Sequence, residues 1–226
     1  MTMLRAFLLA AAALLGSAQA AVIDFSEFVA GDLVNDIVVD GVTITVNSQA
    51  IKNNGTRNDR AMVFDTDNYT GNDHDLAGPF TDVRGGADIA PGNVLIISED
   101  GDSSDPDDNH QGGWIEFVFD SPVSFESFAA FDINQLGAIE LELFDSSGSL
   151  GTVSNQYAAN PNQYELIEFV ASDVTRALFT LTGSGAIGNI TLASDAVQTP
   201  LPAAGLLFGA GLFIGLSLHR RRALER

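Results

Sequence analysis

The amino-acid sequence predicts an all-β fold, an antiparallel β-sandwich of jelly-roll-like type formed by residues 21–198. Short apolar runs with period-two alternation recur along this part of the chain; in Ala138–Phe144, apolar and acidic side chains alternate. Turn-forming pairs such as Asp40-Gly41 separate many of these runs. No stretch of residues 21–198 keeps a helical period, so many short strands joined by turns are expected.

The predicted elements follow from these runs and turns. The expected strands are Val22–Phe28, Val42–Val46, Ala61–Phe64, Val94–Ile97, Trp114–Phe119, Val123–Phe131, Ala138–Phe144, Ser149–Val153, Tyr164–Phe169, Ala177–Leu181 and Ile187–Leu192. Phenylalanine is used heavily, and we expect much of the core to come from Phe117, Phe119, Phe125, Phe128, Phe131, Phe144, Phe169 and Phe179. The polar region Lys52–Gln111 predicts long loops at one end of the sandwich, ordered by something bound to them.

The first 20 residues have the pattern of a secretory signal peptide. Arg5 precedes an apolar run, Ala6–Leu15, and the small residues Ala18 and Ala20 form a cleavage site. Cleavage after Ala20 is expected. The alternative, an amphipathic first helix of the domain, lacks a polar face.

Residues 199–226 have the pattern of a membrane-spanning tail. The apolar run Leu201–Leu218 would be about 27 Å long as a helix, which nearly matches a hydrocarbon core of about 30 Å. A basic cluster follows at once and would stay cytoplasmic: Arg220, Arg221 and Arg222. The alternative is a buried core helix, but the terminal position and the basic stop argue against it.

The tail also resembles a known sorting signal. Pro200, Leu201 and Pro202, the Gly-rich apolar span and the arginine cluster together resemble the PEP-CTERM signal over 28 residues. Leu201 departs from the more frequent Pro-Glu-Pro. The resemblance implies export through the secretion translocon across the inner membrane of a Gram-negative bacterium. It further implies recognition by exosortase, transient or permanent membrane anchoring, and a final place at the cell surface or in the extracellular matrix.

The charge of residues 21–198 restricts the partners. This part holds 29 acidic and 5 basic side chains, a formal net charge of −24. Such a surface repels nucleic acid and anionic lipid and attracts cations. The chain has no cysteine, which excludes disulfides, thiolate nucleophiles and cysteine-based metal sites.

Two acid-rich segments, each directly after a predicted strand, favour a structural Ca²⁺ ion. Alternating Asp and Asn on a loop can surround calcium with oxygen atoms, although neither segment has the spacing of an EF-hand. The alternative is a solvated acidic surface. The candidate metal ligands are Asp65, Asp67, Asp73, Asp75, Glu99, Asp100, Asp102, Asp105, Asp107, Asp108 and Asn109.

Signals for catalysis are weak, and we expect a protein that is not an enzyme. Residues 21–198 contain only two histidines, His74 and His110, and no Gly-x-Ser-x-Gly nucleophile elbow. The glycines of Gly183–Gly188 match a dinucleotide-binding pattern in form. However, a strand and not a helix is expected to follow, so a hairpin turn explains them better.

The middle of the chain also resembles the lectin-like or carbohydrate-binding β-sandwiches of exported bacterial proteins. The resemblance lies in Asn93–Asp100, the Asp-rich loop after it, and Gly112–Phe117. Trp114 and Tyr69 are the candidate ligand-binding residues because aromatic rings can stack on sugars, as Tyr157 and Tyr164 also could. For Trp114 the apolar neighbours at the start of a strand favour core packing over sugar stacking. The sequence thus favours a non-enzymatic, calcium-stabilised surface or matrix protein. A carbohydrate-binding module acting on exopolysaccharide and a secreted hydrolase remain the alternatives.

Overall fold

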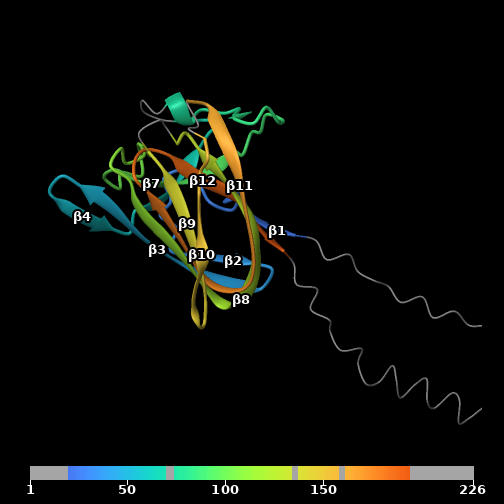
Figure 1. The fold of residues 1–226 in the computed structure, drawn as a ribbon. Helices are drawn as coiled ribbons and strands as arrows, with labels where there is room; N and C mark the ends of the chain where they lie inside the picture. Colours follow the sequence, from blue (N-terminus) through green and yellow to red (C-terminus); the bar gives the residue numbers. More distant parts are fainter. Residues whose placement is uncertain (1–19, 70–73, 134–136, 158–160, 194–226) are drawn as a thin grey trace, which may run out of the picture. The chain divides into compact units, whose positions relative to one another are not determined.

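The computed structural model describes residues 20–69, 74–133, 137–157 and 161–193 (Figure 1). The predicted signal peptide, apart from Ala20, and the predicted sorting tail lie outside the described residues. The one helical element in the described part is a 3-10 turn, η1 (His74–Leu76). The strands are β1 (Ala21–Ile23), β2 (Asp36–Val39), β3 (Val42–Lys52), β4 (Gly55–Asn58), β5 (Ala61–Asp65), β6 (Thr81–Asp82), β7 (Asn93–Ile97), β8 (Gly113–Phe131), β9 (Ile139–Asp145), β10 (Gly148–Ser154), β11 (Gln163–Leu181) and β12 (Ala186–Ala193).

The strands form one twelve-stranded sheet with the order β10-β9-β11-β8-β12-β7-β5. β3 also pairs with β8 and carries β2 and β4, while β1 pairs with β12. Every pairing in the described part is antiparallel except the short parallel contact between β6 and β11. The prediction of an all-β, antiparallel fold is therefore confirmed.

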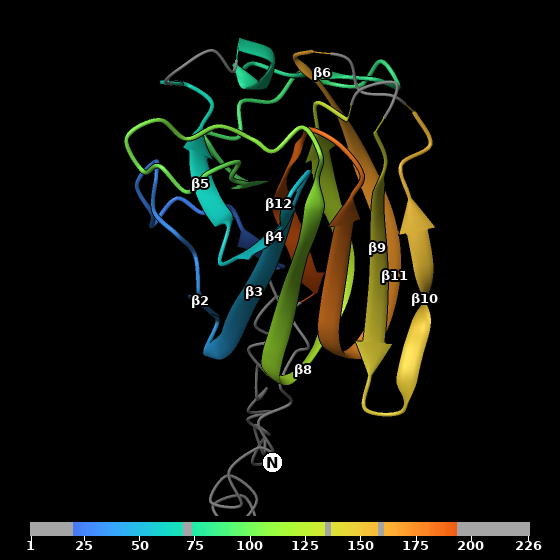
Figure 2. The same cartoon turned by 90° about the vertical axis from the view of Figure 1, so that its left-hand side faces the viewer.

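The two longest strands, β8 and β11, turn this single sheet into two layers (Figure 2). The first half of β8 pairs with β3 and with the end of β11, whereas its second half pairs with β12 and with the start of β11. Register shifts between Glu168 and Arg176 mark the bend of β11. Bulges of this kind bend a strand and increase its twist. The sequence predicted two separate strands in each case, and the structure corrects this to one continuous bent strand.

The main core lies between the two layers. The ring of Phe179 meets Phe128 at 5.0 Å and Phe117 at 5.6 Å between centroids, in edge-to-face geometry. Such pairs add about 0.5–1.5 kcal/mol beyond the apolar area they bury. Of the eight phenylalanines expected in the core, all but Phe144 and Phe169 are buried. Phe169 packs against the core from its rim.

Phe144 takes a different place from the one predicted. Leu143 faces the core, so strand alternation turns the next side chain outward. There the guanidinium of Arg176 lies 3.4 Å from the centroid of the Phe144 ring, a cation–π contact. Arg176 also donates a 2.9 Å hydrogen bond to Glu116.

A second apolar cluster lies on the outer face of the β5-β7-β12 layer. In β7, Leu95 faces the main core while Val94 and Ile96 belong to the second cluster, so this strand is buried on both faces. Leu76 and Phe80 cover the cluster from the segment of residues 66–92, and both are fully buried. Leu76 and Phe80 thus anchor this polar segment to the sheet by apolar packing, which the sequence did not predict. The expectation that a bound group orders the loops stays a prediction.

The chain enters and leaves the described domain at the same end. Ala21 is paired with Leu192 across β1 and β12, and Ala193 is paired with Ser124, next to the bend of β8. The longer connecting segments lie at the opposite end, where η1 and β6 are at the top of Figure 2; we call this the loop end. Within the described residues, no helix is long and apolar enough to span a membrane.

Candidate functional site

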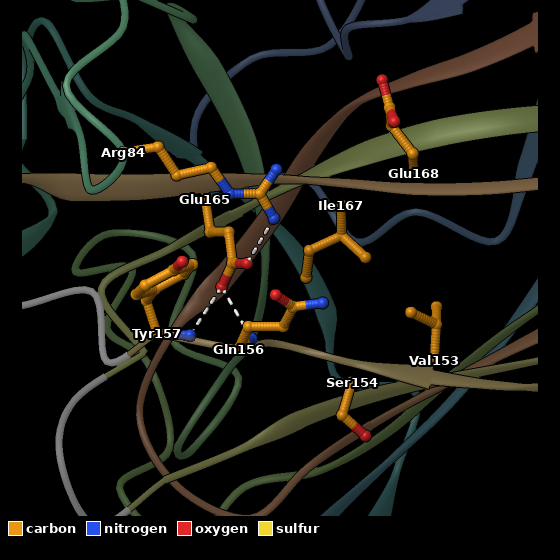
Figure 3. Close-up of a pocket in the computed structure, with 8 residues that line it drawn as sticks. All are labelled: Arg84, Val153, Ser154, Gln156, Tyr157, Glu165, Ile167 and Glu168. Atoms are coloured by element: carbon orange, nitrogen blue, oxygen red, sulfur yellow. Dashed lines mark hydrogen bonds and ion pairs between the residues drawn. The ribbon is translucent and has the colours of Figure 1, made fainter.

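A pocket of about 400 Å³ opens between two sheet edges, β10 and the first half of β11 (Figure 3). β10 is the last strand of its layer, and past Tyr164 the outer edge of β11 has no strand partner in the described part until β9 pairs at Arg176. The volume falls within the ~300–1,000 Å³ of small-molecule sites. The pocket is lined by Arg84, Val153, Ser154, Gln156, Tyr157, Glu165, Ile167 and Glu168.

Glu165 is the buried charge at the base of this pocket. Its side chain is 1% exposed, and one carboxylate oxygen accepts a 2.8 Å hydrogen bond from Nη2 of Arg84. The other oxygen accepts hydrogen bonds from the backbone N–H groups of Gln156 (3.0 Å) and Tyr157 (3.1 Å). A buried carboxylate is costly unless it is paired and hydrogen-bonded, and here both conditions hold. Glu165 therefore fixes Arg84 and the segment after β10 to the same strand.

Arg84 reaches the pocket from the turn after β6. Oδ1 of Asp82 accepts a 2.8 Å hydrogen bond from the Arg84 backbone, which closes the turn. The Cζ atom of Arg84 lies 5.7 Å from the centroid of the Tyr157 ring, and that ring belongs to a residue that is 47% exposed. An exposed aromatic face beside a guanidinium and a carboxylate offers stacking together with hydrogen bonds.

Sequence reasoning named Tyr157 only as one of several possible stacking residues, and it missed Arg84 and Glu165. The two charged residues are 81 positions apart, so no local pattern connects them. One signal was present: Glu165 is two residues before Ile167, which faces the core, so it is a charge on an inward-facing position of a strand.

The first acid-rich segment is only partly described, because Asp73 lies outside the described residues. Oδ1 of Asp65 accepts a 2.9 Å hydrogen bond from the backbone of Asp67, a turn-forming contact. Tyr69 meets His74 at 3.1 Å between its hydroxyl and Nδ1, with the two rings edge to face at 5.0 Å. The candidate ligand-binding residue Tyr69 thus takes a histidine as its neighbour.

In the second acid-rich segment, several acids hold the loop itself. Oδ1 of Asp100 accepts a 2.8 Å hydrogen bond from the backbone of Asp102. Oδ1 of Asp102 accepts hydrogen bonds from the backbone (2.9 Å) and hydroxyl (2.7 Å) of Ser104, which hold the pKa of Asp102 below its usual value. These side chains are exposed, as is Asp105.

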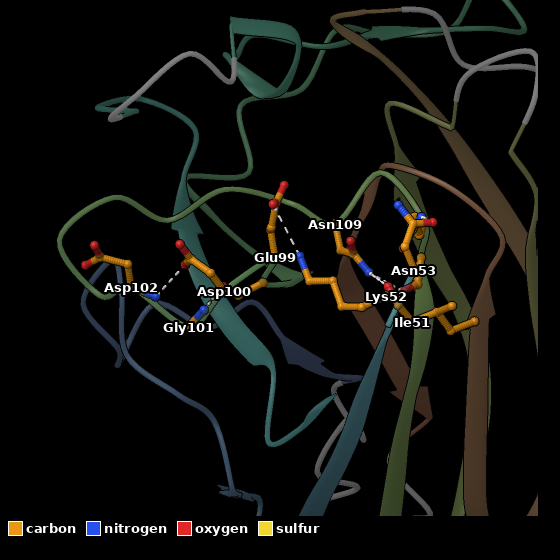
Figure 4. A network of polar contacts seen from close by, with 11 residues as sticks. Ile51, Lys52, Asn53, Glu99, Asp100, Gly101, Asp102 and Asn109 are labelled. Atoms are coloured by element: carbon orange, nitrogen blue, oxygen red, sulfur yellow. Dashed lines mark hydrogen bonds and ion pairs between the residues drawn. The ribbon is translucent and has the colours of Figure 1, made fainter. Parts of the chain in front are cut away.

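Asn109 has a structural role in the same segment (Figure 4). It is 1% exposed, and its Nδ2 donates to the carbonyl oxygens of Ile51 (2.7 Å) and Gly112 (2.6 Å). These bonds attach the acid-rich loop to β3.

Asp108, in the second acid-rich segment, is half-buried. It accepts hydrogen bonds from the hydroxyl of Ser184 (2.6 and 2.9 Å) and from the backbone of Gly185. Burial raises the pKa of Asp108 to about 6; the hydrogen bonds oppose this rise, while the charges of Asp75 and Asp107 add to it. The structure thus brings one acid of the first segment within electrostatic reach of two acids of the second.

The prediction of a calcium site stays a prediction. Within the described ranges, no three acidic or histidine side chains converge as a metal-binding group. Carboxylates are the donors that calcium prefers, and Asp75, Asp107 and Asp108 supply them in one region.

Trp114 lies on the outer face of its layer and is half-buried, so it does not pack in the core. Its neighbours across the sheet are Gln49 and Thr180, and its Nε1 donates a 3.3 Å hydrogen bond to Oε1 of Gln49. The two candidate ligand-binding residues thus have different hydrogen-bond partners, Gln49 for Trp114 and His74 for Tyr69. The glycines before β12 do not form the expected hairpin turn, because β8 lies between β11 and β12 in the sheet. Gly185 donates its backbone N–H to Asp108.

The chain matches no family model, and no curated protein is similar to it in sequence.

Proposed function

We propose that the chain is a non-enzymatic exported protein of the cell surface or extracellular matrix, a jelly-roll-like β-sandwich sorted through a PEP-CTERM-like tail. The observation that carries this proposal is the position of the domain boundaries. β1 begins at Ala21, directly after the expected cleavage site at Ala20. β12 ends at Ala193, a few residues before the expected tail begins at Thr199.

The pairing of these two strands supports processing at both ends. Ala21, Val22 and Ile23 pair with residues of β12, so a mature chain that begins at Ala21 keeps every residue of β1. Removal of residues from 199 onward would likewise leave β12 complete. Neither cut therefore removes a residue from the strands that the structure describes.

The acidic loop end is at the opposite end of the domain from Ala193. An attachment made through residues after Ala193 therefore leaves the loop end free to meet surface polymer. We propose that calcium bound by acids of the two loop segments stabilises this end. The supporting observation is the half-buried carboxyl of Asp108, whose pKa is raised by burial and further by the charges of Asp75 and Asp107. A divalent cation would relieve this repulsion.

Mass spectrometry of the protein from membrane and matrix fractions of an exosortase-containing host tests the sorting proposal. We expect a chain that begins at Ala21 and is cut near Pro202. In a variant carrying Arg220→Gln, Arg221→Gln and Arg222→Gln, we expect the C-terminal cut to be lost while the N-terminal cut remains. Recovery of the unchanged chain with Met1 from the cytosol would contradict the proposal.

A carbohydrate-binding module is the second candidate function, and the pocket of Arg84, Tyr157 and Glu165 favours it. An exposed tyrosine ring can stack on a sugar, while the guanidinium beside it can donate to hydroxyl groups. In a glycan array, Tyr157→Ala should abolish binding and Tyr157→Phe should keep it. Trp114→Ala and Tyr69→Ala test the residues chosen from the sequence. Binding that survives Tyr157→Ala would exclude this pocket.

A further inference from the structure

Positive charge is scarce in this domain and is concentrated at one place. Three of the five basic side chains in residues 21–198, Lys52, Arg57 and Arg60, line a single pocket of about 290 Å³. Asn54, Glu99 and Asp100 complete its lining. The other two basic residues, Arg84 and Arg176, each form an ion pair with a glutamate.

The pocket is at the β3–β4 hairpin, which projects from the layers (Figure 1). β3 pairs with β8 only up to Ala50, while β4 pairs only with the end of β3, and all four residues of β4 are exposed. The base of the hairpin is fixed, because the backbone of Ile51 donates to Gly112 at 2.9 Å and accepts from Asn109. The pocket therefore has a rigid inner wall and an open outer side.

Lys52 closes one side of the pocket. Its Nζ lies 3.3 Å from Oε1 of Glu99, which ties the hairpin to the acid-rich loop (Figure 4). Glu99 neutralises the charge of Lys52 in this ion pair, so Arg57 and Arg60 are the cationic groups of the pocket that a ligand can meet.

Arg57 and Arg60 have no carboxylate partner within 4.0 Å among the residues that the structure describes. Arg57 donates to the carbonyl of Thr56 at 3.0 Å, and Arg60 to the carbonyl of Asp59 at 3.4 Å. Both contacts are to backbone and use Nη1 only. In a domain with 29 acidic side chains, two arginines without an ion pair in one pocket indicate a site for an external anion.

The loop on the far side makes room for Arg60. A Cβ atom at Gly101 would come within 2.5 Å of Nη1 of Arg60, and Gly101 has φ +83°, a conformation that favours glycine. The glycine thus allows the guanidinium to lie against the backbone of the acid-rich loop, beside Asp100.

We propose that this pocket binds the carboxylate of an acidic sugar, a uronic acid unit of a polysaccharide. A guanidinium presents parallel N–H donors that match the two oxygens of a carboxylate. Three cations and two anions line the pocket, a formal charge of +1 that suits a singly charged group. Asn54 and Asp100 can exchange hydrogen bonds with sugar hydroxyls, and the two carboxylates disfavour a doubly charged phosphate.

The negative charge of the rest of the domain restricts which acidic polysaccharides could bind in this pocket. A polymer with a carboxylate on every unit would be repelled by the remaining acidic surface. The preferred ligand is therefore a chain end or an isolated uronic acid between neutral sugars. This inference is independent of the sorting tail and of the Arg84 pocket.

Titration calorimetry of the mature protein tests the inference. The probes are a glucuronic-acid-containing oligosaccharide, its neutral glucose counterpart, inorganic phosphate and inorganic sulfate, all at low ionic strength. We expect the uronate oligosaccharide to bind at least about tenfold more tightly than any of the other three. Equal affinity for the neutral oligosaccharide, or tighter binding of phosphate or sulfate, would overturn the proposal.

Substitutions locate the site. Arg57→Gln and Arg60→Gln should each weaken uronate binding about tenfold, and Arg57→Lys should recover only part of the loss because a lysine lacks the planar fork. Ser146→Glu is the control, since it lowers the net charge by the same one unit at an exposed turn between β9 and β10. We expect Ser146→Glu to change the affinity less than about twofold. If Ser146→Glu lowered the affinity for the uronate oligosaccharide as much as Arg57→Gln does, the effect would come from net charge and the proposed site would be refuted.

Discussion

Nη2 of Arg84 lies 2.8 Å from Oε1 of Glu165, whose side chain is 1% exposed, while that of Arg84 is 42% exposed. The pair joins the turn after β6 to β11. Two backbone N–H groups of the segment after β10 reach the second oxygen of the same carboxylate. One carboxylate thus joins β11 both to the segment that precedes it and to Arg84, which is 81 positions away in the sequence.

Removal of the cation from this pair should destabilise the domain. Arg84→Gln leaves the carboxylate of Glu165 with its two backbone donors but without its cation, so we expect a loss of about 1–3 kcal/mol in the free energy of unfolding. Lys52→Gln breaks a pair in which Glu99 is 42% exposed, and a loss of about 0–1 kcal/mol is expected. Urea unfolding of both variants measures the difference. Equal losses in the free energy of unfolding would show that the Arg84–Glu165 pair stabilises the domain no more than the exposed Lys52–Glu99 pair does.

Asp108 should make stability depend on pH. Because burial raises the pKa of Asp108 to about 6 in the folded state, the native protein holds this proton more tightly than the unfolded chain does. The free energy of unfolding should therefore fall as the pH rises from about 4 to about 6, by about 3 kcal/mol, and level off above that window. Asp108→Asn removes this contribution, so the difference between wild type and variant should change across the same window. Chelator is present throughout, and a constant difference would count against the raised pKa.

Calcium should raise the melting temperature. A ligand that binds only the native state stabilises it by about 2.7 kcal/mol at a hundred times its dissociation constant. We expect a higher Tm in millimolar calcium than in chelator, and a smaller shift in Asp108→Asn. Asp24, outside both acid-rich segments, gives the matched control Asp24→Asn. If wild type shows no shift in millimolar calcium, the metal proposal fails.

Phe80→Ala should open the segment of residues 66–92 without unfolding the layers. The fully buried ring of Phe80 meets Phe131 at 4.8 Å in the second apolar cluster. Loss of a buried phenylalanine costs about 3–5 kcal/mol. We expect this cost to fall on the segment that Phe80 anchors, because a local opening costs less than global unfolding. Hydrogen exchange should show faster exchange at Gly78 and Ile89, with β8 and β11 amides unchanged. Uniform acceleration throughout the domain would contradict local opening.

Local signals predicted the turns well, and distant contacts were not predictable. Asp40 and Gly41 have φ of 50° and 82°, the pair of positive values that a tight hairpin needs, and the sequence named this turn directly. The sequence predicted two separate strands, Trp114–Phe119 and Val123–Phe131, and Pro122 lies between them at the bend of β8. The regular hydrogen bonding is interrupted at this point, but the strand continues, because the proline lies in a bulge.

The candidate site depends on pairings between distant segments, which no local pattern carries. From the sequence, Arg84 resembles an ordinary surface residue in a polar segment. Only the folded chain brings Arg84 next to Glu165. For the same reason, the sequence shows how many acids each segment has but not that Asp108 is half-buried while Asp102 is exposed.

Ala21 and Leu192 are partners on neighbouring strands, so the domain begins and ends at almost the same point in space. Its two ends lie one strand spacing apart, about 5 Å, so the domain can be spliced into a surface loop of an unrelated host without stretching the host backbone. The same geometry makes a circular permutant accessible: a short linker from Ala193 to Ala21, with new ends in the β9–β10 turn, should leave both layers in register.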